Sequence, residues 1–325
     1  MAPLLSIVIP TYNRGFFLEQ LLFSIDHYAR AEEIPKDLLE VVVVDNASTD
    51  GTPAICQDYS TRIARFRSVR RTELVAAEVN IISSSLVATG EWVWTFGDDD
   101  IIHAGSLKKI INLLHHLSAD IVFLNYSSVW KNGTTRHLER LSNLESTSTP
   151  IPLGNLITQR YFFQIISFIS ASVCRRACLA AVDYAPYQTG FVPAYSHVLV
   201  KLEAFAKRPA LFIAEPLLAQ RLDNTRVNLE ADVRTVSSGI TFFKGCLSLI
   251  ERGCVDANEL WAMSAGEPGM QPVFVHDMLA GHFFGNRRFA PGSNNFETVQ
   301  RFLLDEGEHL PHSVQRWLRL LLGGK

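Results

Sequence analysis

Three consecutive carboxylates, Asp98, Asp99 and Asp100, are the side chains of this 325-residue chain best suited to chemistry. They follow the apolar run at residues 90–94, which predicts a buried strand that ends at the cluster. Adjacent like charges repel one another unless a cation neutralises them, and hard oxygen ligands suit Mg²⁺ or Mn²⁺ bound together with a substrate phosphate. We therefore expect Asp99, Asp98 and Asp100 to hold a divalent metal. The alternative is a solvated acidic turn that caps the next helix.

The first third of the chain alternates strand and helix patterns that would position this cluster. Strands are predicted at residues 5–9, 39–44, 66–70 and 90–94, and helices at 16–25, from about 53, and at 79–88. The consecutive valines at 41–44 suit a strand that is covered on both faces. The succession predicts an α/β protein with a mostly parallel central sheet.

Polar residues follow three of these predicted strands. They are Thr11, Tyr12, Asn13 and Arg14 after the first, Asp45, Asn46 and Ser48 after the second, and Asp98 to Asp100 after the fourth. In open α/β sheets a ligand lies outside the carboxyl ends of the strands. Asp45 could accept a hydrogen bond from a nucleobase, while backbone groups around Pro10 and Thr11 would face the base and ribose. Arg14 could meet a phosphate or an acidic neighbour. Such turns are commonplace singly, so their convergence is the stronger signal.

The same residues form an ordered set of motifs. They read Ser6-Ile7-Val8-Ile9-Pro10-Thr11-Tyr12-Asn13-Arg14, then Val43-Val44-Asp45-Asn46-Ala47-Ser48-Thr49-Asp50-Gly51-Thr52, then Gly90-Glu91-Trp92-Val93-Trp94-Thr95-Phe96-Gly97-Asp98-Asp99-Asp100. This set resembles glycosyltransferase family 2. The resemblance implies a GT-A (Rossmann-like) fold, a nucleotide-sugar donor and a requirement for Mg²⁺ or Mn²⁺.

Within that family the chain is most similar to abequosyltransferase-like enzymes of bacterial O-antigen assembly. The similarity rests on Phe96-Gly97-Asp98-Asp99-Asp100, Tyr195-Ser196-His197 and Arg221-Leu222-Asp223-Asn224. It implies a glycan or lipid-linked saccharide acceptor in the synthesis of O-antigen or capsule.

Two departures from the family pattern bear on mechanism. The first Asp of the usual Asp-x-Asp-Asp metal motif falls at Gly97, so metal ligation would rest chiefly on Asp99, with Asp98 replacing the missing carboxylate. The Glu-Asp pair that often supplies the base of inverting members is replaced by Ser196-His197.

His197 and Asp100 are therefore the candidates for the catalytic base. A neutral imidazole can accept the proton of an attacking hydroxyl, although His197 could instead ligate the metal or cap a helix. Asp100 could equally be the N-cap of a helix that begins near Gly105. The stereochemical outcome, inversion or retention, stays open.

The rest of the chain divides into an acceptor side and a helical end. Strands are expected at residues 120–126, 165–173, 210–214 and 217–221, an exposed acceptor loop at 131–152, and helices at 233–252, 273–284 and 296–304. Arg221 could neutralise the leaving diphosphate or pair with Asp223. We expect a GT-A catalytic domain over 1–225, with nucleotide-sugar binding in 1–120 and the acceptor side in 121–225, and a helical C-terminal region over 226–325.

Composition narrows partners and compartment. The formal charge of −3 gives no support for binding nucleic acid, and five scattered cysteines suggest reduced thiols in a cytoplasmic protein. No run approaches the roughly 20 apolar residues of a membrane span. The amphipathic segment 313–322 could dock peripherally on the inner membrane, but more often such a helix packs on its own domain or on a sister subunit. A homo-oligomer is therefore open.

These patterns together predict a metal-dependent glycosyltransferase. One alternative is a sugar nucleotidyltransferase, although those enzymes usually carry a Gly-rich loop where this chain has residues 10–14. Another is a non-catalytic nucleotide- or glycan-binding protein, made plausible by the altered metal motif and the replaced acidic base.

Overall fold

A computed structural model describes residues 2–130, 135–159, 161–188, 195–222, 231–261, 263, 291–310 and 312–323. Its centre is one mixed sheet with the strand order β3-β2-β1-β4-β9-β6-β10-β5, while β7 pairs with β6 and β8 pairs with β10. The strands are β1 (Leu5–Thr11), β2 (Leu39–Asp45), β3 (Phe66–Arg70), β4 (Trp92–Thr95), β5 (Ile101–Ile102), β6 (Ile121–Trp130), β7 (Thr135–Leu138), β8 (Ile151–Pro152), β9 (Ser172–Arg175) and β10 (Pro209–Arg221).

The strands β1 to β4 run parallel, as the sequence predicts. Every residue of β1 and β2 is buried, which explains their uninterrupted apolar pattern. Because β9 is antiparallel to both β4 and β6, and β10 is parallel to β6, the C-terminal ends of β1, β2, β4 and β10 lie at one edge of the sheet. Thr11, Asp45, Thr95 and Arg221 therefore end their strands on the same side.

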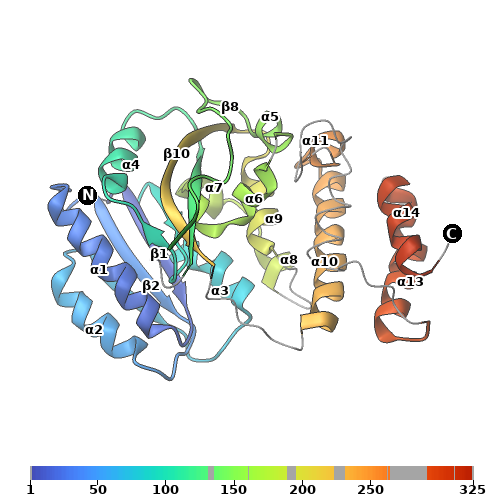
Figure 1. The fold of residues 1–325 in the computed structure, drawn as a ribbon, viewed down its shortest axis with the longest axis horizontal. Helices are drawn as coiled ribbons and strands as arrows, with labels where there is room; N and C mark the ends of the chain where they lie inside the picture. The colour runs from blue at the N-terminus through green and yellow to red at the C-terminus, as the bar shows by residue number, and fades with distance from the viewer. Residues whose placement is uncertain are drawn as a thin grey trace.

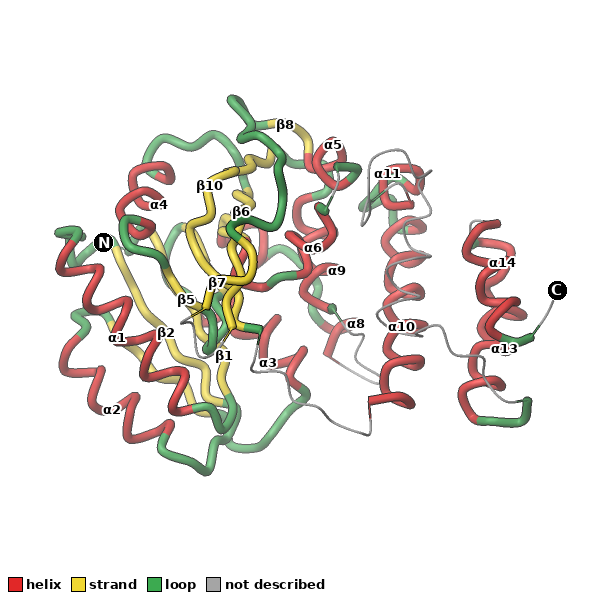
Figure 2. Tube along the Cα trace, viewed as in Figure 1, coloured by secondary structure: helices red, strands yellow, loops and turns green. Residues whose placement is uncertain are grey.

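Helices cover both faces of this sheet (Figures 1 and 2). On one face lie α1 (Gly15–Ala31), α2 (Thr52–Arg62) and α4 (Ser106–Leu114), and on the other lie α3 (Ala77–Ser84), α6 (Phe162–Ser167), α7 (Arg176–Ala180) and α9 (Ser196–Phe205). Shorter elements are η1 (Ser85–Val87), α5 (Leu153–Ile157), η2 (Ile169–Ala171) and α8 (Ala185–Gln188). The predicted α/β architecture is confirmed.

Two local predictions on the acceptor side are wrong. The apolar run 165–173 was expected to be a strand, but it forms the end of α6, then η2, and only its last two residues enter β9. A short buried helical turn and a buried strand share the same apolar pattern, so periodicity cannot separate them. The two closing strands form one strand, β10, whose register shifts between Ile213 and Leu218 around Pro216, a residue that has no N–H to donate to a neighbour.

The described secondary-structure elements of the C-terminal part are all helices. Its elements are α10 (Ala231–Glu251), α11 (Ala257–Trp261), α13 (Asn294–Glu306), η4 (Gly307–His309) and α14 (His312–Leu321). The predicted helices at 233–252 and 296–304 are confirmed, and the one at 273–284 lies outside the described residues. The division of the chain at residue 225 stays a prediction.

Helix α10 packs closely against α9. A Cβ on Gly245 would lie 2.4 Å from the Leu199 side chain, so the glycine permits this approach. At the end of α10, Arg252 donates two hydrogen bonds to the Glu203 carboxylate, at 2.8 and 2.9 Å. Tyr187 donates to the same carboxylate at 2.5 Å. These contacts fasten the C-terminal helices to the helix that carries His197.

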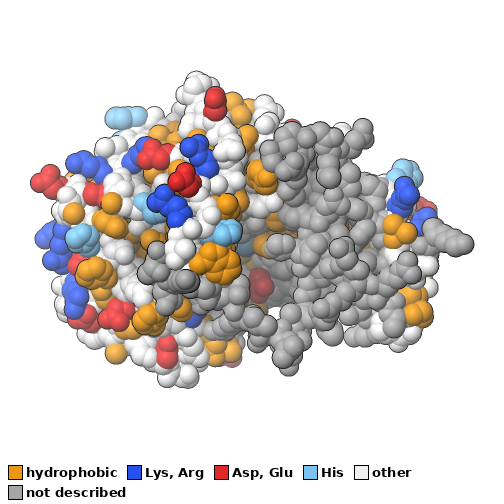
Figure 3. Space-filling view, viewed as in Figure 1, with side chains coloured by type: hydrophobic (Ala, Val, Ile, Leu, Met, Phe, Trp, Pro, Cys, Tyr) orange, Lys and Arg blue, Asp and Glu red, His pale blue; other side chains and the backbone are white. Residues whose placement is uncertain are grey.

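Three further facts concern membrane spans, surface charge and cysteines. Among the described helices, none is long and apolar enough to cross a membrane. Charged side chains of both signs are interspersed over the described part of the face seen in Figure 3. All five cysteines are free thiols, as the sequence predicts, and four of them are buried.

Candidate active site

The three polar clusters predicted to converge do meet at the carboxyl edge of the sheet. The Thr11 hydroxyl donates to the Asp98 carboxylate at 2.7 Å, which joins the end of β1 to the loop after β4. The backbone N–H of Asn13 donates to the Ser48 hydroxyl at 2.9 Å, and the N–H of Asn46 donates to the Thr11 carbonyl at 2.9 Å. The parallel strands thus place these loops side by side, while the roles of their residues stay predictions.

Arg14 pairs with two members of the acidic cluster. Its Nε lies 3.0 Å from Asp98 Oδ1, and its Nη2 lies 2.5 Å from Asp99 Oδ2. The Asp98 side chain is only 7% exposed, whereas those of Arg14 and Asp99 are 22% and 23% exposed. The two carboxylates therefore share Arg14 as a cationic partner, whose side chain is partly exposed although its Nε and Nη2 are buried.

This arrangement fits a divalent metal that arrives with a diphosphate. Among the described residues, no three His, Cys, Asp or Glu side chains form a group that could hold a metal alone. Mg²⁺ typically needs only one or two protein carboxylates when substrate phosphates complete its shell. Asp98 and Asp99, which already share one cationic partner, offer that pair.

Asp100, the third carboxylate of the cluster, is hydrogen-bonded to Ser170, and its role as a metal ligand stays a prediction. The Ser170 hydroxyl donates to Asp100 Oδ2 at 2.5 Å and accepts the backbone N–H of Gly97 at 2.8 Å. A Cβ at position 97 would lie 2.5 Å from the same carboxylate oxygen, so Gly97 makes room for Asp100. Burial, followed by the charge of Asp99, raises the pKa of Asp100 well above its usual range. Sequence reasoning missed Ser170, and nothing near it in the chain signals this contact.

Asp45 is fixed by two donors at the end of β2. Its Oδ1 accepts the backbone N–H of Ser48 at 2.9 Å, and its Oδ2 accepts from Arg70 Nη1 at 3.0 Å. Arg70 also donates to the Ser48 carbonyl at 2.6 Å. Each carboxylate oxygen has a second lone pair, so a nucleobase N–H could still bind. Sequence reasoning missed Arg70, although its place at the end of a predicted strand was a usable signal.

The loops around Asp45 and Thr11 adopt unusual backbone conformations. Asn13 and Ala47 have φ values of 51° and 60°, in the left-handed region that Ala rarely visits. The Asn13 side chain accepts the N–H of Thr49 at 2.7 Å. The Asn46 side chain exchanges two hydrogen bonds with the backbone of Val75, at 2.9 and 3.0 Å. Asn13 and Asn46 therefore hold the loops in place.

Pro10 and Tyr12, the other predicted donor-binding residues, flank Thr11. Pro10 is buried within β1, opposite Val44 of β2. Tyr12 follows the last residue of the strand and stays partly exposed. Tyr12 therefore keeps some exposed area at the edge where Thr11 and Asp45 end their strands.

Arg221 ends β10 beside the acidic cluster. Its Nε donates to the Asp99 carbonyl at 3.0 Å, and its Nη2 donates to Gln20 at 3.1 Å. Both the Arg221 and Arg14 guanidinium groups lie over the Phe17 ring, 5.3 and 5.4 Å from its centroid. Arg221 Nη1 is buried and, within the part of the chain that is described, has no hydrogen-bond partner. The predicted turn at residues 223–224 lies outside the described residues.

A pocket of about 530 Å³ opens beside this arginine on the α1 face. Its lining includes Phe16, Gln20, Phe23, Asp100 and Arg221. The volume is in the range of small-molecule sites. Asp100 and Arg221 therefore border open space, and Asp98, Asp99, Thr11 and Arg14 lie next to them.

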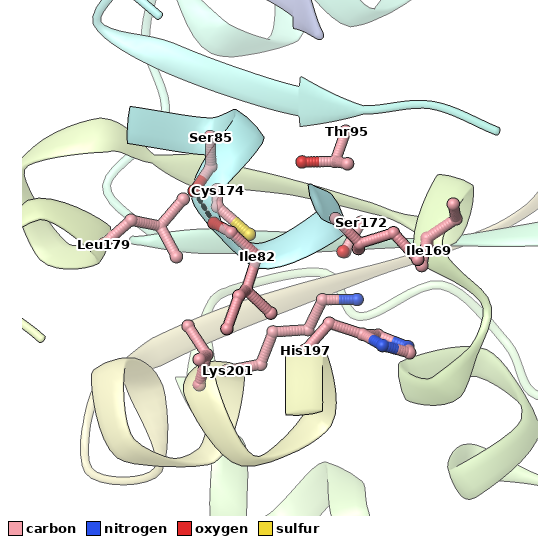
Figure 4. Close-up of a pocket in the computed structure, with 11 residues that line it drawn as sticks. Ile82, Ser85, Thr95, Ile169, Ser172, Cys174, Leu179, His197 and Lys201 are labelled. Carbon is pink, nitrogen blue, oxygen red and sulfur yellow. Dashed lines mark hydrogen bonds between the residues drawn. The ribbon is translucent and has the colours of Figure 1, made fainter. Parts of the chain in front are cut away.

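His197 lies apart, at the start of α9 on the other face. Its Nε2 lies 2.7 Å from the Ser167 carbonyl, which can only accept, so Nε2 carries the proton and Nδ1 the lone pair. Burial and then the Lys201 charge lower the pKa of His197 to about 3. The residue keeps some exposed area because it borders a pocket of about 30 Å³, which Figure 4 shows with Thr95 and Ile169 on its other sides. The structure thus separates His197 from the acidic cluster by the segment 167–170.

Two proteins of similar sequence are named as glycosyltransferases. The abequosyltransferase RfbV of Salmonella typhimurium is 26% identical over 243 residues, which cover 72% of this chain and 71% of RfbV. The uncharacterized glycosyltransferase MG060 homolog of Mycoplasma pneumoniae is 24% identical over 176 residues, which cover 50% of this chain and 56% of that protein. The second match thus spans little more than half of the relative.

Solved structures show the same fold. Staphylococcus aureus TarS 1-349, in complex with UDP, has a TM-score of 0.64 at 17% identity and covers 98% of this chain and 88% of its own. The mannosyltransferase PcManGT of Pyrobaculum calidifontis, in complex with GDP-Man and Mn²⁺, has a TM-score of 0.50 at 16% identity and covers 99% and 86%. The fold is therefore GT-A. The family profile described as Glycosyl transferase family 2 matches residues 6–174, just over half of the chain, and the chain belongs to that family.

Proposed function

We propose that the protein is a metal-dependent glycosyltransferase of bacterial surface polysaccharide synthesis, of the O-antigen or capsule type. It would move a hexosyl or deoxyhexosyl group from a nucleotide-sugar to a hydroxyl of a glycan or lipid-linked acceptor. The observation that carries this proposal is the pair Asp98 and Asp99, which share the cationic partner Arg14 at the carboxyl edge of the sheet. Similarity to an abequosyltransferase supports it. Family membership gives no support to the nucleotidyltransferase or the non-catalytic alternative.

The donor would lie across the strand ends. Asp45 would accept a hydrogen bond from the nucleobase, and the Pro10 to Arg14 and Asn46 to Ser48 loops would enclose the nucleoside. Asp98 and Asp99 would hold Mg²⁺ or Mn²⁺, which when bound supplies positive charge to the leaving diphosphate. The buried Nη1 of Arg221, which has no hydrogen-bond partner among the described residues, would donate to the same diphosphate.

Of the two base candidates, Asp100 fits the acceptor proton better. Asp100 is one of the residues that line the 530 Å³ pocket, whereas His197 directs its protonated nitrogen at a backbone carbonyl. The weakly basic Nδ1 would be the only site on His197 for a proton. We therefore assign the proton of the attacking hydroxyl to Asp100.

A nucleotide-sugar donor would suit an enzyme of the cytoplasm, where nucleotide-sugars are made. A lipid-linked acceptor would bring it to the inner membrane. Helix α14, which buries Leu318 and exposes Arg316, Arg319 and Leu320, is the surface proposed for any peripheral contact.

A thermal-shift panel tests the proposal. UDP, GDP, CDP, CMP and dTDP are each added with and without Mn²⁺, because a ligand of the native state raises the melting temperature by linkage. We expect one nucleotide to give a Mn²⁺-dependent shift that Asp99→Ala abolishes. The matched control is Asp58→Ala, which also removes an arginine-paired carboxylate, on exposed α2. No shift with any nucleotide, or an equal shift in Asp99→Ala, would overturn the proposal.

A further inference from the structure

Helix α9 presents two buried nitrogen donors to the end of α6. Lys201 Nζ donates to the Ile166 carbonyl at 3.0 Å, and His197 Nε2 donates to the Ser167 carbonyl at 2.7 Å. The two donors are four positions apart, which places them on one face of the helix. Figure 4 shows both side chains projecting from α9 on the same side.

These contacts solve a problem that every helix end creates. The last carbonyls of a helix lack partners within the helix, and α6 ends at Ser167. Lys201 is only 7% exposed, and a buried ammonium is costly unless it is hydrogen-bonded. Within the described ranges no ion pair involves Lys201, so a backbone carbonyl takes the place of a carboxylate partner. Burial lowers the pKa of Lys201 to about 8, which leaves it mainly charged at neutral pH.

The anchored segment leads directly to the acidic cluster. Three residues after Ser167, the Ser170 hydroxyl bonds both the Gly97 N–H and the Asp100 carboxylate. The Ser170 carbonyl accepts from Trp94 Nε1 at 2.7 Å. A continuous chain of hydrogen bonds and backbone therefore runs from α9, through residues 166–170, to the turn that carries Asp98, Asp99 and Asp100.

We propose that His197 and Lys201 are positioning residues, which fix residues 166–170 so that Ser170 holds Asp100 and the Gly97 turn in place for the metal and the donor diphosphate. The part of this proposal that concerns metal and donor rests on the proposed function. The part that concerns the Gly97 turn rests on the fold alone. Both parts give His197 a role that needs only its N–H.

The chemistry of substitutes separates this role from that of a base. Glutamine at position 197 can donate an N–H to the Ser167 carbonyl but cannot take a proton from a hydroxyl. Leucine can do neither. A positioning role therefore predicts rescue by His197→Gln relative to His197→Leu, whereas a base or metal-ligand role predicts that both variants fail.

The experiment combines amide hydrogen exchange with titrations of Mn²⁺. Exchange is followed at residues 97–100 in the wild type and in Ser170→Ala, Lys201→Met, His197→Gln and His197→Leu. Binding of UDP–Mn²⁺ and GDP–Mn²⁺ is measured on the same proteins. The matched control is Lys207→Met, because Lys207 also donates to a backbone carbonyl, that of Gly253, but lies beyond the end of α9.

We expect exchange at residues 97–100 to rise at least tenfold in Ser170→Ala and Lys201→Met, and affinity for the nucleotide–Mn²⁺ complex that the wild type binds to fall several-fold. His197→Gln should stay closer to the wild type than His197→Leu in both measurements, and Lys207→Met should change neither. If Lys201→Met fails to fold, Ser170→Ala and the two His197 variants carry the test without burying or exposing a charge.

Two results would overturn the proposal. Unchanged exchange at residues 97–100 in Ser170→Ala would break the chain of contacts. Equal loss of nucleotide–Mn²⁺ binding or turnover in His197→Gln and His197→Leu, with wild-type exchange, would return His197 to the chemistry. If the wild type binds neither UDP–Mn²⁺ nor GDP–Mn²⁺, the proposed donor site fails for these probes, while the exchange measurements still decide the role of the α9 pair.

Discussion

The acidic cluster and the α9 pair solve the same problem in opposite ways. Both place charge in a poorly solvated part of the protein, where an unpaired charge is costly. Asp98 and Asp99 meet the side chain of Arg14, which is 22% exposed. Lys201 and His197 meet backbone carbonyls that cannot leave. A partner on a long, partly exposed side chain can give way to a ligand, whereas a backbone partner can only hold its position.

This contrast distinguishes two sides of the sheet. On the ligand side, Asp98, Asp99 and Arg14 can change partners when a ligand binds. On the supporting side, Lys201 and His197 hold residues 166–170 in place. Asp100 belongs to both, because it adjoins Asp99 in the chain but is held by Ser170 from the supporting side. A substitution near Asp100 therefore gives the strongest test of the difference between the two sides.

The largest effect is expected from Gly97→Ala. The added Cβ would lie 2.5 Å from Asp100 Oδ2, so the carboxylate must leave Ser170. We expect donor turnover to fall about 10²-fold, as for ångström-scale misplacement of a reacting group, and the free energy of unfolding to fall by about 1–3 kcal/mol. Turnover of the nucleotide-sugar identified by the thermal-shift panel, and urea unfolding, measure the two effects.

Gly51→Ala is the matched control for that substitution. Its added Cβ meets nothing within 4 Å, and its φ of −70° suits alanine. Near-normal turnover of Gly97→Ala would show that Asp100 need not stay where Ser170 holds it.

A pH series probes the supporting side. The pKa of His197 is about 3 in the folded protein and ordinarily 6.5, so only the unfolded chain binds a proton between these values. Stability should therefore be fully present above pH 6.5 and fall as the pH drops toward 3, by about 1 kcal/mol per pH unit from this group. Lys201 on the same helix, Cys174 across the small pocket and the Tyr195 ring, 5.9 Å away, are the titratable neighbours.

Urea unfolding of the wild type and His197→Gln at pH 7.5, 6.5 and 5.5 measures this contribution. Carboxylates titrate in both proteins, so the difference between the two curves isolates His197. The variant should lose less stability on acidification. Parallel curves would mean that the imidazole is protonated without difficulty in the folded state.

The smallest effect is expected from Arg14→Gln on the ligand side. Removing a partly exposed arginine costs little stability, about 1 kcal/mol, and takes one positive charge away from both carboxylates, while the Thr11 hydroxyl still donates to Asp98. Mn²⁺ alone should then bind about two- to fivefold more tightly, which isothermal titration can measure. Arg30→Gln, which removes the arginine of the Asp26 pair in α1, is the control and should leave Mn²⁺ affinity unchanged. Weaker binding of Mn²⁺ in Arg14→Gln would show that Arg14 does not compete with the metal.

The loops of the ligand side could largely be predicted from the sequence, and the contacts of the supporting side could not. Strands such as residues 41–44 can be predicted from their consecutive valines. Because parallel strands end at the same edge of a sheet, the polar residues that follow them lie close together. The bond between Ser170 and Asp100 joins positions 70 residues apart, and Lys201 meets a carbonyl 35 residues away. Such contacts depend on how α6, η2 and α9 pack, and the run 165–173 did not even reveal its helical turn. Single-sequence patterns carry no information about pairings of that kind.

The left-handed backbone of Asn13 and Ala47 has a thermodynamic consequence for the donor. Ordering a residue costs about 1–2 kcal/mol, and the left-handed conformation adds about 1–2 kcal/mol for a residue such as alanine. Both costs fall on the folding of the chain, because hydrogen bonds within the protein, made by side chains such as Asn13 and Asn46, hold the loops. A nucleotide therefore meets loops that are already ordered. Its association should involve little loss of backbone entropy, and its heat of binding should report on contacts alone.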